Sequence, residues 1–138
     1  MSVSNAIIYK FGPSSNAAQN AAANLGLATT SYNTGADDSA FSAALGAALA
    51  NDTVLIIDSP GDVMPQHVVD AIVTFVAAGG HVVMSYWNLD AHPDLQAAFE
   101  VSVTQDMFSP ETVMDGTPSA IFDGLPPEIY FTDRASDD

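Results

Sequence analysis

The sequence predicts an α/β domain with a doubly wound, mainly parallel sheet of the flavodoxin-like type. We expect three layers, with four to five central strands and helices on both faces. Apolar runs at 6–11, 53–58 and 81–87 predict strands, and the last two runs are nearly continuous, as in strands that are buried on both faces. Helix-length segments separate them, and strand–helix–strand spacing of this kind predicts parallel pairing. We expect these three strands to be adjacent, central and parallel.

The first helix is predicted from its stop and start signals. Gly12–Pro13 ends the first strand, and Ser14 or Ser15 can cap the alanine-rich segment that follows. Gly26 is a suitable residue just past the end of that helix, because glycine accepts a positive φ. The segment 27–32, LATTSY, then predicts a second strand.

The second helix follows a cluster of turn residues. Asp37 or Asp38 can cap it, and Phe41, Leu45 and Leu49 recur at intervals of four residues, which is typical of an apolar helix face. This helix should lead to the strand at 53–58.

The third helix is the clearest in the sequence. Pro65 suits its first turn, apolar residues recur at helical spacing through 66–78, and Gly79 and Gly80 stop it before the strand at 81–87. The segment 53–87 therefore predicts one complete βαβ unit.

After Asp90 the pattern is weaker. It predicts a short helix at 93–100, a fifth strand at 101–105, a turn of helix at 119–125 and an edge strand at 128–131, with proline-containing loops between them. The length of 138 residues fits a single domain over 1–138, and the ending DRASDD suggests that this domain comes from a larger protein.

Three segments carry a resemblance to a known family. They are VLIIDSPGD at 54–62, FVAAGGHVVMSYW at 75–87 and SAIFDGLPPEIYFTD at 119–133. Over residues 52–131 the chain resembles the class I glutamine amidotransferase-like superfamily, and within it the trehalose-utilisation (ThuA-like) branch. The resemblance implies a flavodoxin-like fold.

The chain differs from that family at the positions of the catalytic residues. Amidotransferases of the superfamily carry a cysteine on a glycine-flanked turn after the strand that corresponds to 81–87, and this chain has no cysteine. The ThuA-like group carries a histidine near the position of Tyr86. The resemblance therefore implies an inherited fold without the catalytic residues.

The charge of the chain limits its partners. There are 17 acidic residues against 2 basic ones, a formal charge of -15, so neither nucleic acid nor an anionic membrane surface is an expected partner. No apolar run of about 18 residues is present, so we expect no membrane insertion. The acidity fits a high-salt habitat, a secreted or cell-surface protein that meets divalent cations, or simply a soluble surface.

The stretch SYWNLD follows a predicted buried strand and gives the candidate ligand site. In open α/β sheets, ligands bind beyond the carboxyl ends of the strands. Aromatic, amide and carboxylate groups there suit a carbohydrate or a protein partner. The alternative is that the tryptophan only covers the core. The candidate residues are Ser85, Tyr86, Trp87, Asn88 and Asp90.

Three carboxylates should gather at the same edge: Asp58, Asp62 and Asp90. Together with backbone carbonyls they could bind Ca²⁺, and we expect no other cofactor. A solvated acidic rim is the alternative interpretation. Asp58 also resembles a phospho-acceptor aspartate, but the acidic pair and lysine of receiver domains are missing.

Catalysis is not expected. The GxSxG motif is absent, and a Ser85–His92 pair is the remaining arrangement for a serine hydrolase; otherwise His92 would be an exposed loop residue. We interpret the chain as a non-catalytic binding or structural module of a larger surface or secreted protein. The alternative is a degenerate or unusual hydrolase that acts at the same crevice. The oligomeric state stays open.

Overall fold

The structure is a computed structural model. It describes residues 3–12, 16–58, 63–86 and 88–103, together with the backbone of two short strands at 112–114 and 128–130. The chain divides into two compact units, Met1–Val103 and Thr104–Asp138, which are described separately. The prediction of one domain over 1–138 therefore stays a prediction.

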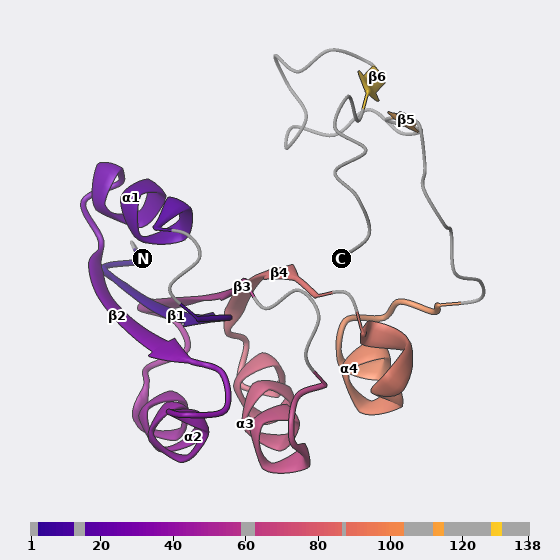
Figure 1. The fold of residues 1–138 in the computed structure, drawn as a ribbon. Helices are drawn as coiled ribbons and strands as arrows, with labels where there is room; N and C mark the ends of the chain where they lie inside the picture. The colour runs from indigo at the N-terminus through magenta and orange to yellow at the C-terminus, as the bar shows by residue number, and fades with distance from the viewer. Residues whose placement is uncertain are drawn as a thin grey trace. The chain divides into compact units, whose positions relative to one another are not determined.

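The first unit contains a four-stranded sheet in which all strands are parallel (Figure 1). The order across the sheet is β2–β1–β3–β4. The strands are β1 (Asn5–Lys10), β2 (Ala28–Asn33), β3 (Thr53–Asp58) and β4 (His81–Ser85). The predicted adjacency and direction of the three strongest strands are confirmed.

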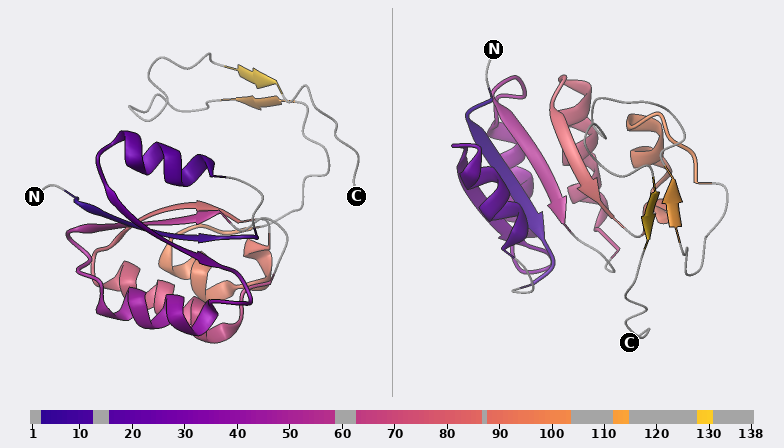
Figure 2. Two further views of the ribbon diagram at one scale, coloured as in Figure 1. Left: turned by 60° about the vertical axis from the view of Figure 1, so that its left-hand side comes forward. Right: turned by 90° about the horizontal axis from the view of Figure 1, so that it is seen from above.

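Helices cover both faces of this sheet. Figure 2 shows α1 (Ala17–Asn24) on one face and α2 (Asp38–Ala47), α3 (Gln66–Ala77) and α4 (Pro93–Ala98) on the other. A short 3-10 turn, η1 (Leu89–Ala91), precedes α4. The unit is therefore an α/β fold of the flavodoxin-like type, as the sequence predicted.

The main core lies between the sheet and α2, α3 and α4. The apolar stripe of α3 is buried, and the ring of Tyr9 stacks on Phe41 with centroids 4.3 Å apart. Each fully buried large apolar side chain of this kind stabilises the fold by about 1.5–3 kcal/mol. The largest fully buried side chains are Tyr9, Phe41, Ile8, Leu45, Leu55, Ile57, Ile72, Leu95, Val68 and Val69.

One expectation about β4 is wrong. We expected a central strand buried on both faces, but β4 lies at an edge of the described sheet and Val83 is 61% exposed. Val82 and Met84 pack against the core on the α3 side. The single helix on the opposite face, α1, contacts β1 and β2, so it covers only that half of the sheet within the described residues.

The predicted glycine stops are confirmed. Gly26 and Gly79 have φ of 75° and 84°, and each follows a helix that closes with a pair of backbone hydrogen bonds typical of a Schellman motif. Gly80 has a different reason. A Cβ placed there would lie 2.2 Å from the buried ring of Phe75.

The predicted helix caps are not formed as expected. Neither α1, which begins after Asn16, nor α2, which begins after Asp37, has a side-chain cap hydrogen bond. Ser14 and Ser15 lie outside the described residues. The Asp37 carboxylate instead accepts from the N–H of Asn33 at the end of β2, and the Asp38 carboxylate accepts from the N–H of Gly35 in the loop before α2.

The predicted fifth strand does not form over residues 101–103. The N–H of Val103 donates instead to the Gln96 side chain at 3.0 Å, which ties this segment to α4. In the second unit, β6 (Glu128–Tyr130) occurs where an edge strand was expected. It pairs antiparallel with β5 (Thr112–Met114), which the sequence did not predict. The segment 119–125 lies outside the described residues.

Candidate functional site

Four polar residues form a row across the carboxyl edge of the parallel sheet. They are the last residues of their strands and lie in register, in the order Asn33, Lys10, Asp58 and Ser85. Parallel strands that end together bring their terminal side chains to one edge.

The centre of this row is the topological switch point of the sheet. The chain leaves β1 toward α1 on one face, and leaves β3 toward α3 on the other (Figure 2). In open α/β sheets this divergence of loops creates the crevice in which ligands bind. Lys10 and Asp58 are paired in register across it.

Lys10 is one of two basic residues in the chain and is only 9% exposed. Its Nζ donates to Asn16 Oδ1 at 3.4 Å, just before α1 begins. Lysines are rarely buried this deeply without polar partners. Lys10 therefore places one of the two basic side chains beside the switch point of an otherwise acidic protein.

A hollow of about 220 Å³ opens at the same edge, on the α2 and α3 side. The β2–α2 loop contributes one wall and the segment before α3 contributes the other. The lining residues are Tyr9, Thr34, Gly35, Asp38, Val63, Met64 and Pro65. One wall is thus polar, and the other is apolar.

The polar wall is held by Asp38. Its Oδ1 accepts hydrogen bonds from the Tyr9 hydroxyl at 2.6 Å and from the Gly35 N–H at 2.7 Å. Asp37 fixes the start of the same loop, because its Oδ2 accepts from the backbone N–H of Asn33 at 2.8 Å and from its side-chain amide at 3.1 Å. Two adjacent carboxylates thus give this loop a defined shape.

Thr34 stands out on this wall. Its Oγ1 is buried and has no hydrogen-bond partner among the residues that the structure describes. Buried hydroxyl groups are nearly always hydrogen-bonded, to protein, water or a ligand. Thr34 also lines the hollow, so this wall contains a hydroxyl whose hydrogen-bonding capacity is not used by the described residues.

Tyr86 was a predicted ligand-binding residue, and the structure gives its hydroxyl a role within the fold. That oxygen accepts from the Met64 N–H at 3.0 Å and lies 2.9 Å from Nε2 of His92, whose ring stacks against Tyr86. The alternative of an exposed His92 is wrong, because this side chain is 6% exposed. Tyr86 joins the segment before α3 to the segment before α4.

The other predicted ligand-binding residues are only partly brought together. Ser85 is exposed at the end of the row, Asp90 is exposed on η1, and Asn88 is half-buried, with a buried Nδ2 that has no partner among the described residues. Trp87 lies outside the described residues. Within them, Ser85 and His92 form no hydrogen bond with each other, so a serine–histidine pair is not assembled.

The predicted calcium site can be followed only in part. Asp58 ends β3 and Asp90 lies on η1, whereas Asp62 lies outside the described residues. Among the described side chains, no group of three or more His, Asp or Glu residues could hold a metal ion. A calcium site that includes Asp62 stays a prediction.

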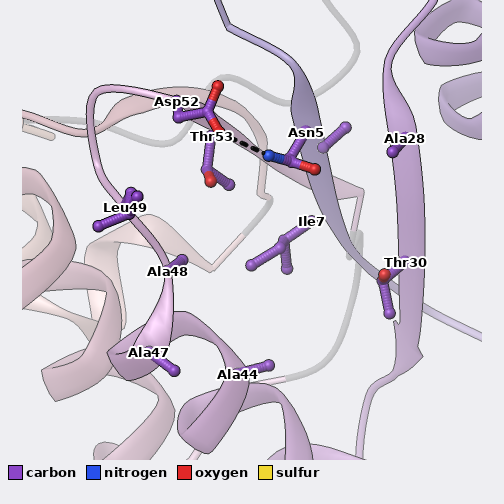
Figure 3. A pocket seen from close by; sticks show the side chains of 11 residues that line it. Asn5, Ile7, Ala28, Thr30, Ala44, Ala47, Ala48, Leu49, Asp52 and Thr53 are labelled. Atoms are coloured by element: carbon purple, nitrogen blue, oxygen red, sulfur yellow. Dashed lines mark hydrogen bonds between the residues drawn. The ribbon is translucent and has the colours of Figure 1, made fainter.

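The opposite, amino end of the sheet carries a second hollow of about 300 Å³ (Figure 3). Small side chains at the end of α2 and just after it, among them Ala44, Ala47 and Ala48, form much of its lining. Asn5 and Asp52 also line it, and Asn5 Nδ2 donates a hydrogen bond to Asp52 Oδ2 at 2.8 Å. Small residues form much of this hollow, and two of its polar side chains, Asn5 and Asp52, already bind each other.

Sequence reasoning missed Tyr9, Thr34 and Asp38. Tyr9 lies near the carboxyl end of β1 and Thr34 directly follows β2, so both lie where ligands bind in this fold. Their positions were a usable signal. The hydrogen bond from Tyr9 to Asp38 spans 29 residues of sequence, and no local pattern predicts it.

Comparisons of the chain with models of known protein families, with curated proteins and with solved structures found no match. The likeness to amidotransferases therefore stays a hypothesis. Among the helices that the structure describes, none has both the length and the apolar character needed to cross a membrane.

Proposed function

We propose that this chain is a non-catalytic binding module of a larger surface or secreted protein, and that it holds a small polar ligand at the carboxyl edge of its sheet. The observation that carries the proposal is the hollow of about 220 Å³ lined by Tyr9, Thr34 and Asp38. It lies beside the polar row that ends the four parallel strands.

Three features support this site. The hollow lies at the switch-point edge, where the fold places ligands. It joins an apolar wall to a few convergent polar groups, as small-molecule sites do. Its walls are also held in place by hydrogen bonds, which limits the entropy lost when a ligand binds.

A hydrolase receives less support. The reacting pair would be Ser85 and His92, but the ring of His92 is buried and bonded to Tyr86. General-base catalysis requires the base within hydrogen-bond reach of the nucleophile. The binding module is therefore the function that the described geometry supports best.

The test is a screen of small polar compounds by ligand-induced thermal stabilisation. The compounds that bind are then measured against two matched variants. Thr34→Val removes the unpartnered hydroxyl from the carboxyl-edge hollow, and Thr30→Val makes the same change at the amino-end hollow. The proposal predicts weaker binding only in Thr34→Val. Equal affinities in both variants, or no binder in the screen, would contradict it.

A further inference from the structure

We infer that the carboxyl-edge hollow selects a primary ammonium group attached to a short alkyl chain. The inference rests on the proposed function, because it names the ligand class of the same hollow. It starts from the hydrogen-bonding atoms on the polar wall and from the net charge of the chain.

The polar wall offers acceptors. Asp38 uses only Oδ1 for its bonds to Tyr9 and Gly35, and its Oδ2 has no hydrogen bond among the described residues. Thr34 Oγ1 is also unpartnered there. The donors nearest to the carboxylate, the Tyr9 hydroxyl and the Gly35 N–H, are already directed at Oδ1. The free carboxylate oxygen requires a donor, and the Thr34 hydroxyl can accept a second one, although it can also donate. An ammonium group matches these acceptors, because it has three donors and no acceptor.

The opposite wall is apolar and open to solvent. Val63 is 63% exposed, while Met64 is buried and Pro65 is half-buried. An alkyl chain lying along this wall would remove its apolar surface from water. The volume of about 220 Å³ limits the ligand to a few carbon atoms.

The negative charge of the chain favours the binding of an amine over that of a neutral polyol of the same size. The formal charge of the chain is -15, so its field concentrates small cations and gives neutral molecules no advantage. A hydrogen bond to a charged group is also about twice as strong as one between neutral groups. The hollow holds only one carboxylate, whereas Ca²⁺ needs six to eight oxygen ligands.

The test compares n-butylamine with 1-butanol, which has the same carbon chain but no charge at neutral pH. Binding to the whole chain is followed through the backbone amide signals of residues 33–38 and 63–64 in two-dimensional NMR spectra. We expect butylamine to shift these signals at lower concentration than butanol. The affinity should fall as NaCl rises from about 0.01 M to about 1 M, because salt screens the attraction.

Two matched variants locate the charge that matters. Asp38→Asn keeps an Oδ1 acceptor for Tyr9 and Gly35 but removes the negative charge, and we expect it to weaken butylamine binding at least about tenfold. Glu100→Gln removes one charge from an exposed residue after α4 and should leave the affinity unchanged. If Asp38→Asn does not fold, the salt dependence and the comparison with butanol still test whether the hollow selects an ammonium group.

The outcomes separate this inference from the proposed function. Equal binding of butylamine and butanol, or equal loss in the two variants, would overturn the ammonium assignment. If compounds from the screen nevertheless bind Thr34→Val more weakly than the wild type, the binding-module proposal would still be supported. A peptide with one lysine, tested with and without Nε-acetylation, distinguishes the two sources of the group. Binding of the unmodified peptide alone points to a protein partner, and binding of butylamine alone points to a free amine.

Discussion

Tyr86→Phe tests whether this aromatic residue stabilises the fold or serves a ligand. The substitution removes one oxygen, which accepts from the N–H of Met64 and lies 2.9 Å from His92 Nε2. Met64 is 3% exposed and His92 is 6% exposed, so neither group gains a water molecule easily. Leaving a buried donor unsatisfied costs about 1–3 kcal/mol.

Urea unfolding followed by far-UV circular dichroism measures this loss. With an m-value of about 1.5 kcal/mol/M, a loss of about 2 kcal/mol lowers the midpoint by about 1.3 M. Tyr32→Phe is the matched control, because Tyr32 packs edge-on against Phe41 and its hydroxyl makes no hydrogen bond among the described residues. We expect that control to change the midpoint little.

A double-mutant cycle with His92→Ala adds a specific check on the contact. Residues that share a hydrogen bond show a coupling energy of about 0.5 kcal/mol or more. If Tyr86→Phe unfolds at the same urea concentration as the wild type, the hydroxyl does not hold these two segments together. Tyr86 would then again be a candidate ligand-binding residue.

Three further predictions concern stability. Glu100 follows α4 with a φ of 55°, a left-handed conformation that strains a residue with a side chain. Glu100→Gly should therefore raise the free energy of unfolding in urea titrations by up to about 1 kcal/mol, and a lower free energy of unfolding would contradict this explanation. Gly80→Ala should lower the free energy of unfolding by about 1–3 kcal/mol, because the added Cβ would meet the Phe75 ring. Gly46 lies inside α2 with open space around it, so Gly46→Ala should be neutral or stabilising in the same assay. Added NaCl should raise the melting temperature measured by calorimetry, since it screens a formal charge of -15, and a flat response would mean that the charges are well dispersed.

Much of the sheet could be predicted because its signals are local. The apolar runs at 53–58 and 81–85 and the helix between them depend on period and length alone, and glycines mark the helix ends. The position of β4 at an edge could not be predicted, because its apolar sequence is the same whether or not a further strand lies beside it. The partner of 101–103 was missed because a side chain, Gln96, replaces a strand.

The sequence predicted a ligand site at the carboxyl edge of the sheet, and the hollow that we propose as the site lies at that edge but is lined by other residues. The rule for open α/β sheets gives the carboxyl edge from the order of elements. It does not say which side chains serve the ligand and which serve the fold. Tyr86 and His92 satisfy each other, and Asp38 binds back to Tyr9. Both pairings depend on how distant segments pack.

The most direct test of the binding site is its location. The tightest binder from the screen is titrated into isotopically labelled protein, and the backbone amide shifts are mapped onto the sheet. The binding-module proposal predicts that the largest shifts cluster at residues 33–38 and 63–64, around the hollow of about 220 Å³ at the carboxyl edge. Shifts confined to residues 28–30 and 44–53, around the amino-end hollow, would contradict it.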